Sequence, residues 1–111
     1  MTDETAYKIL TAPQFAALQA GRFEGAPVDV ADGYIHLSTA AQLDETLAKH
    51  FAGQEGLVIA AVPLARLGEA LRWEVSRGGA LFPHFYGRLE MRHVSASTAL
   101  SRDAQGRALL P

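Results

Sequence analysis

The stretch that decides how this chain folds is residues 34–38, Tyr34-Ile35-His36-Leu37-Ser38. Polar and apolar residues alternate along it, and successive side chains of a β-strand point to opposite faces. Ile35 and Leu37 therefore predict a face that packs into the core. The other face carries a phenol, an imidazole and a hydroxyl, groups that donate and accept hydrogen bonds or protons. We expect a strand with a binding or catalytic face, held between Gly33 and a helix start at Thr39.

Two helix starts surround this strand. Residues 11–14 and 39–42 both have the capping-box pattern, in which a threonine is followed three residues later by a glutamine. They predict one helix that ends at Gly21 and a second over residues 40–51. The segment 22–33 is rich in Gly, Pro and Asp, which predicts a loop.

The remaining strands follow from short apolar or alternating runs. Residues 6–10 predict one strand, and the continuous apolar run 57–62 predicts a strand buried on both faces. Alternation predicts strands over 71–75 and 88–94, and the aromatic segment 82–87 is expected to be extended. About five short strands and two main helices predict an α+β fold with a small split or mixed sheet.

Size and composition fit one domain over residues 1–111. We expect a flexible tail at residues 1–5 and a C-terminal extension at 95–111. The net charge of −2 argues against a nucleic-acid partner, and the lack of cysteine excludes disulfides and thiolate metal sites. No segment approaches the ~20 apolar residues that span a bilayer. A cytoplasmic protein without a membrane partner is expected, and its oligomeric state is left open.

His36 and Ser38 are the first candidates for chemistry. Two residues apart on one strand face, they lie ~6–7 Å from each other. A nucleophile and its base need contact at about 2.6–3.2 Å, so the pair is no hydrolytic dyad. The two side chains either line one pocket or have structural roles, with the histidine bonded to backbone groups.

Glu74 lies on an alternating strand beside a tryptophan and is a candidate acid, base or electrostatic stabiliser. The alternative is a surface ion pair with Arg72 or Arg88. His36, His84 and Glu74 are residue types that bind zinc or iron, but no local ligand spacing supports a metal site, and none is expected.

His84 and Tyr86 share one face of the aromatic segment if that segment is extended. An imidazole and a phenol there suit stacking against a flat ligand ring. Phe82 and Phe85 have a simpler interpretation as core residues.

Four segments together resemble the bacterial domain-of-unknown-function family 952. They are Tyr7-Lys8-Ile9, residues 32–39, Trp73-Glu74 and residues 82–87, and the resemblance spans residues 7 to about 94. That family looks like a compact relative of the ADP-ribosyltransferase superfamily, whose enzymes grip NAD in the cleft of a split β-sheet. The resemblance implies that fold here, with NAD or a related nucleotide as the substrate.

It also implies roles for particular residues. Catalytic roles fall to His36, Glu74 and His84, and ligand-binding roles to Tyr34, Ser38, Thr39, Phe82 and Tyr86. The first strand carries Lys8 where the superfamily has His or Arg. An alternative is therefore a non-catalytic module that binds a small, nucleotide-like ligand. A third is an unrelated hydrolase or isomerase with His36 or His84 as its base.

Overall fold

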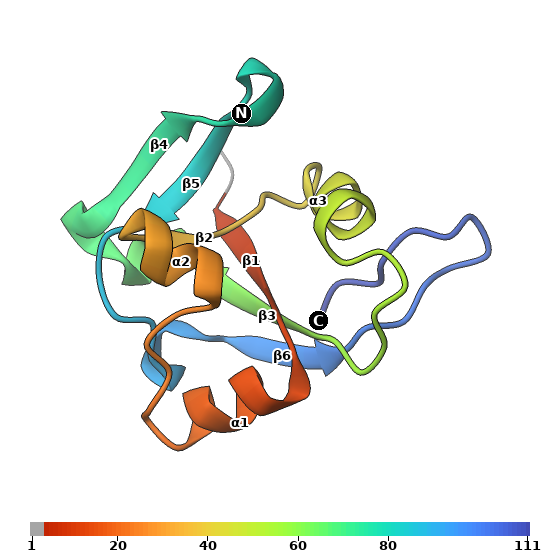
Figure 1. The fold of residues 1–111 in the computed structure, drawn as a ribbon, viewed down its shortest axis with the longest axis horizontal. Coiled ribbons are helices and arrows are strands. Elements are labelled where there is room, and N and C mark those ends of the chain that lie inside the picture. The colour runs from red at the N-terminus through yellow and green to blue at the C-terminus, as the bar shows by residue number, and fades with distance from the viewer. Residues whose placement is uncertain (1–3) are drawn as a thin grey trace.

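The computed structural model describes residues 4–111, apart from the side chain of Arg77. It contains two three-stranded antiparallel sheets and three α-helices (Figure 1). The strands are β1 (Thr5–Leu10), β2 (Ile35–His36), β3 (Val58–Pro63), β4 (Leu71–Val75), β5 (Leu81–Phe85) and β6 (Ala96–Ala99). The α-helices are α1 (Ala12–Gln19), α2 (Pro27–Asp32) and α3 (Leu43–His50), and short 3₁₀ turns cover Leu64–Arg66, Gly68–Ala70, Arg77–Gly79 and Met91–His93.

The two sheets have the strand orders β1-β3-β6 and β2-β5-β4. They meet just beyond β2, where the Ser38 N–H donates to the Tyr7 carbonyl at 3.0 Å and the Tyr7 N–H donates to the Ser38 carbonyl at 2.8 Å. This bridge places the end of the segment 34–38 against β1. The α+β class is confirmed. The described residues form six strands in two small antiparallel sheets, where the sequence predicts about five strands in a small split or mixed sheet.

The core lies on both faces of the sheet β1-β3-β6. The first cluster includes Ala6, Leu10, Ala60, Val62, Ile35 and Leu37, and the second includes Tyr7, Ile9, Ile59, Ala61, Leu43 and Leu47. The apolar run of β3 is therefore buried on both faces, as its sequence predicts. Ile35 and Leu37 are 3% and 2% exposed, which confirms the core face of the opening stretch.

The helix predictions hold in part. The Thr11–Gln14 capping box is present and begins α1. Thr39 and Gln42 also exchange their side-chain bonds, but these close a turn, and α3 begins only at Leu43. The prediction of a loop over 22–33 is wrong, because it contains α2. That helix has only six residues, too few to show a helical period.

The prediction of a strand over 88–94 is also wrong. Residues 91–93 form a 3₁₀ turn, in which His93 Nδ1 accepts a hydrogen bond from the Glu90 N–H at 3.0 Å. Leu89 and His93, four residues apart, are both buried and anchor this turn. The edge of β3 is instead paired by β6, within the expected C-terminal extension. Of the residues predicted to form an N-terminal tail, Thr5 begins β1 and the Glu4 carbonyl accepts a hydrogen bond from the Leu64 N–H, and residues 1–3 lie outside the described part.

The hairpin β4–β5 reaches beyond the core (Figure 1). Leu71 packs against the core, whereas Trp73 and Val75 on the same face are 37% and 68% exposed. The alternation of β4 therefore produces two distinct faces, but only one end of the apolar face is buried.

Candidate functional site

One face of the sheet β2-β5-β4 carries most of the residues singled out by the sequence. The register pairs His36 with His84 and His84 with Arg72. Side chains alternate along a strand, so the residues on this face are Arg72, Glu74, Phe82, His84, Tyr86 and His36. The opposite face holds the core residues Ile35 and Phe85. The prediction that Phe85 belongs to the core is confirmed.

Four aromatic rings gather on this face around Tyr34. Its ring stacks on His84 with a centroid distance of 4.1 Å, and lies 4.6 Å from His36 and 5.1 Å from Tyr86. The two histidine rings are 5.4 Å apart. The sequence segments 34–38 and 82–87 therefore meet in one cluster.

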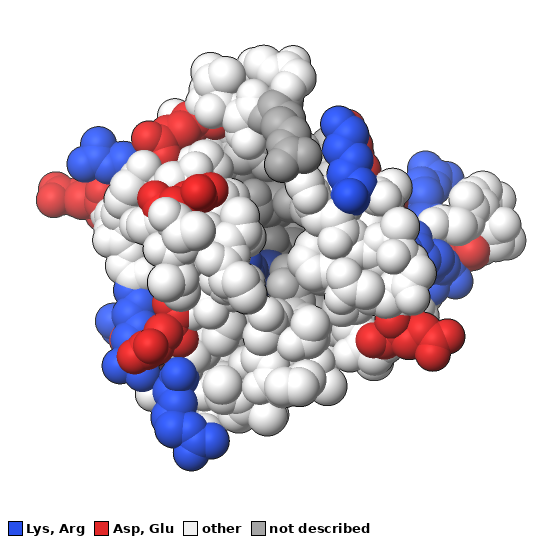
Figure 2. Space-filling view, in the orientation of Figure 1, with Lys and Arg blue, Asp and Glu red and all other residues white. Residues whose placement is uncertain are grey.

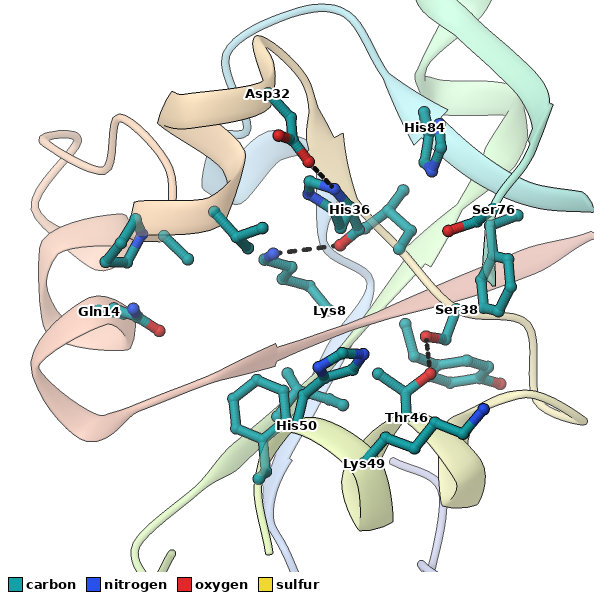
Figure 3. Close-up of a pocket in the computed structure, with 18 of the residues that line it drawn as sticks. Lys8, Gln14, Asp32, His36, Ser38, Thr46, Lys49, His50, Ser76 and His84 are labelled. Carbon is teal, nitrogen blue, oxygen red and sulfur yellow. Dashed lines mark hydrogen bonds and ion pairs between the residues drawn. The ribbon is translucent and has the colours of Figure 1, made fainter. Parts of the chain in front are cut away.

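Glu74 holds the ring of His84. Its Oε1 lies 2.8 Å from His84 Nδ1 and accepts a hydrogen bond from the Tyr86 hydroxyl at 2.7 Å. The bond from Tyr86, and then that from His84, holds the pKa of Glu74 below its usual value. With Nδ1–H donated to the carboxylate, Nε2 is left as an acceptor, and the ring points into a cavity (Figure 3). This is the arrangement of a general base with its orienting carboxylate.

Neither ion pair considered for Glu74 in the sequence is present among the described side chains. Arg72 lies over the Tyr86 ring, with its Cζ 5.5 Å from the ring centroid. Arg88 donates to the Gly21 carbonyl instead.

His36 lies between two carboxylates from α2. Its Nδ1 is 2.7 Å from Asp29 Oδ1, and its Nε2 is 3.0 Å from Asp32 Oδ2. Asp29 also accepts hydrogen bonds from the backbone N–H groups of Ala26 and His36. Each ring nitrogen of His36 is therefore engaged by a carboxylate oxygen.

Asp29 also forms a buried ion pair with Lys8 of β1, at 2.8 Å. Burial alone would raise the pKa of Asp29, but the hydrogen bond from His36 and the charge of Lys8 lower it to about 2. Burial lowers the pKa of Lys8, and Asp29 works against that shift. The Lys8 ammonium donates further to the His36 carbonyl, at 3.1 Å.

A cavity of about 610 Å³ opens beside this network. Figure 2 shows the hollow near the middle of the molecule, with a basic group at its floor. Its lining joins β1, β2, β5, α2 and α3, and includes Lys8, Asp32, Tyr34, His36, Ser38, Thr46, Lys49, Phe82 and His84 (Figure 3). Lys8 and His36 project toward its centre.

The expected site residues fall into three groups. Tyr34, His36, Ser38, Phe82 and His84 line the cavity. Glu74 and Tyr86 lie outside the lining. Glu74 contacts His84 and Tyr86, and the Tyr86 ring lies against that of Tyr34. Thr39 is buried and caps the turn before α3. The Ser38 hydroxyl bonds to Thr46 at 3.0 Å, in keeping with the exclusion of a serine–histidine dyad.

The network also contains residues that sequence reasoning missed. Asp29 and Asp32 were assigned to a loop, and Lys8 was noted only as a departure from a superfamily pattern. A signal for Lys8 was available, since it stands between apolar residues in a short apolar strand and needs a buried counter-charge. Nothing in the local pattern indicated which acid would supply that charge.

Within residues 4–111, no cluster of three or more His, Cys, Asp or Glu side chains has the geometry to hold a metal ion. None of the described helices is long and apolar enough to pass through a membrane.

The comparisons with known proteins agree with the family resemblance. The family model described as "Protein of unknown function (DUF952)" matches residues 9–97. The chain belongs to this family. The DUF952 chain is also similar to protein CC0527 from Caulobacter crescentus. The X-ray structure of that protein superposes with a TM-score of 0.84 and 50% identity, over 95% of this chain and 93% of that one.

A solution NMR structure of CC0527 gives the same result, with a TM-score of 0.79 and 51% identity over 92% of this chain and 89% of the other. No curated protein matches the chain. The DUF952 fold is therefore shared with a bacterial protein over nearly the whole length.

Proposed function

We propose that the cavity binds a nucleotide-like ligand and that the protein is an ADP-ribosyltransferase-like enzyme with NAD as its substrate. The observation that carries the proposal is the convergence of Tyr34, His36 and the Glu74–His84 pair on one cavity wall. The volume of about 610 Å³ is typical of small-molecule and cofactor sites. The resemblance to the superfamily supplies the choice of NAD.

The residues present suit the chemistry. Phe82 would stack on the nicotinamide ring. His36 Nε2 would exchange its contact with the exposed Asp32 carboxylate for a ribose hydroxyl or phosphate oxygen. The C–N glycosidic bond breaks with its electron pair going to nicotinamide, while an acceptor oxygen bonds to the ribose carbon. His84 Nε2 takes the proton from that oxygen. Glu74 keeps the His84 ring in place and stabilises its positive charge.

One observation favours the alternative, a binding module without catalysis. The superfamily resemblance implies His or Arg on the first strand, and this chain has Lys8 there. Its ammonium is buried and occupied by Asp29 and the His36 carbonyl. A group so engaged is less available to a substrate, so the cleft could bind a nucleotide without turning it over.

Calorimetry with NAD and with ADP-ribose, combined with an assay for released nicotinamide over hours, tests both candidates. The enzyme is expected to bind both compounds and to release nicotinamide. Glu74→Gln should lower the rate by about 10²–10⁴-fold, because His84 then loses the carboxylate that orients its ring for proton transfer, and should leave affinity nearly unchanged. A binding module would give the same heats with no release.

Glu90→Gln is the matched control, since Glu90 bonds Arg92, is 45% exposed and does not line the cavity. It should alter neither binding nor release. Absence of heat with both compounds, together with no nicotinamide, would rule out the NAD proposal.

A further inference from the structure

We propose that two copies of this chain associate through the outer edge of β4, which pairs antiparallel with β4 of the second copy about a two-fold axis at Trp73. The inference goes beyond the proposed function and does not depend on any ligand. It rests on the hydrogen-bonding direction of β4, the order of its charges and the exposure of its apolar side chains.

The edge of β4 is open. It is the last strand of its sheet, and within residues 4–111 only β5 pairs with it (Figure 1). Trp73 stands opposite Pro83, whose carbonyl accepts from Leu37 on the β2 side. In an antiparallel sheet, the backbone N–H and C=O of one residue point to the same side of the strand. The Pro83 carbonyl points to β2, so Trp73 has no backbone hydrogen bond to Pro83. The N–H and C=O of Trp73 therefore point to the free edge of β4.

Bonds at both ends of the hairpin agree with this direction. The Ala70 carbonyl accepts from Tyr86, and the Ser76 N–H donates to Ala80, so the even-numbered residues face β5. Trp73 and Val75 therefore have outward backbone groups. A second β4 strand paired about Trp73 would form up to about four backbone hydrogen bonds with the first. The Leu71 N–H would not take part, because it already donates to the Gly68 carbonyl.

The charges on β4 select one register. With Trp73 opposite Trp73, Arg72 of each copy stands opposite Glu74 of the partner subunit, in the closely spaced non-hydrogen-bonded position. A shift by one pair of residues in either direction would place Arg72 opposite Arg72 or Glu74 opposite Glu74. Like charges directly opposite each other are destabilising, so the strand is complementary only to its own copy in this register.

The apolar face of β4 gives the same register a hydrophobic contact. Trp73 is 37% exposed and Val75 is 68% exposed, on the side away from the cavity. In the proposed dimer Trp73 contacts its own counterpart, and Val75 lies opposite Leu71 of the partner subunit. Exposed apolar residues on an open strand edge are otherwise a liability for uncontrolled association.

The dimer would also reach the candidate site. The β2-β5-β4 sheets of the two copies would join into one six-stranded sheet, with the order β2-β5-β4-β4-β5-β2. Both cavities would lie on the same side of this sheet. Arg72 of the partner subunit would approach Glu74, which already binds His84 and Tyr86. The second copy would thus add a positive charge beside the carboxylate that orients His84.

Sedimentation velocity across a concentration series tests the proposal. The edge contact is small, so we expect a weak dimer with a dissociation constant on the order of 10–100 µM, and a mass that rises toward twice 11.9 kDa. Arg72→Glu and Glu74→Arg should each remain monomeric, because each places like charges opposite one another. An equimolar mixture of these two variants should regain the dimer, since both cross-strand pairs then have opposite charges.

Two matched controls separate edge pairing from misfolding. Arg92→Glu reverses an exposed arginine elsewhere and should leave the dimer intact. Val75→Lys should raise the dissociation constant at least tenfold, whereas Val30→Lys, at a similarly exposed valine of α2, should not. A wild-type chain that stays monomeric at about 500 µM, or a charge-reversal mixture that fails to associate, would overturn the dimer. The proposal on NAD would be unaffected, just as failure to bind NAD would leave the dimer standing.

Discussion

Asp29 is the residue on which the geometry of the cluster depends. One carboxylate accepts from Lys8, from the His36 ring and from two backbone N–H groups, so it fixes β1, α2 and β2 relative to one another. A buried charge with this many partners is costly to neutralise, since the opposite charge is then left without its counter-ion.

Asp29→Asn is therefore expected to lower the free energy of unfolding by about 3 kcal/mol, because Lys8 loses its buried counter-charge. Urea unfolding measures the change. Asp32→Asn is the control, since Asp32 bonds the same histidine from a side chain that is 45% exposed. An exposed pair contributes less than about 1 kcal/mol. Equal losses for the two variants would contradict the role given to Asp29.

The same carboxylate gives stability a dependence on pH. The folded-state pKa of Asp29, about 2, lies below the ordinary value of 3.8. Its contribution is therefore complete above pH 3.8 and is lost as the pH falls through 3.8 toward 2. The loss is about 2 kcal/mol. The difference in unfolding free energy between wild type and Asp29→Asn should shrink by this amount as the pH is lowered from 5 to 2. A difference that stays constant over this range would contradict the assignment.

For single residues, the sequence predicts which face of a strand a side chain occupies better than it predicts the contact partners of that side chain. The period of two in residues 34–38 was enough to divide Ile35 and Leu37 from His36. The partners of His36 could not be predicted, since Asp29 reaches it through a six-residue helix that leaves no periodic pattern. The contact partner of Glu74 could not be predicted either, because its neighbours across the strands depend on the register of β4 and β5.

At the scale of elements, the turn after β5 depends on the close approach of two residues. A methyl group on Gly87 would lie 2.7 Å from Cζ of the Phe85 ring, which is itself buried. Gly87→Ala is thus expected to cost about 1–3 kcal/mol of unfolding free energy through overpacking. In a Phe85→Leu background the same substitution should cost less, as a thermal or urea double-mutant cycle would show. Additive costs would mean that the ring is not the obstacle.

The misplaced elements share one physical cause. Residues 88–94 alternate like a strand, yet the buried pair Leu89 and His93 and the bond from Glu90 to His93 favour a 3₁₀ turn. The strand that pairs with β3 comes from the small polar residues of β6, whose own pattern is weak. Both outcomes are decided by which segment reaches the free edge of β3, and a local pattern does not contain that information.

At the scale of the whole molecule, the sequence predicts the α+β class because strand-like runs do not alternate regularly with helices. The place where the two sheets join was not predictable, since they meet at an isolated bridge between Tyr7 and Ser38, which are far apart in the sequence. That bridge also brings the cavity wall of β2 against Lys8 of β1. The central claim, a nucleotide site in this cavity, is therefore a property of how the two sheets are joined.

The most direct test is a titration of isotope-labelled protein with ADP-ribose, followed by backbone amide shifts. We predict saturable changes confined to the cavity wall, at Tyr34, His36 and His84 and their neighbours in β1, with none in the control segment around Glu90. Absence of saturable shifts at millimolar ADP-ribose, or shifts that cluster away from the cavity, would contradict the account.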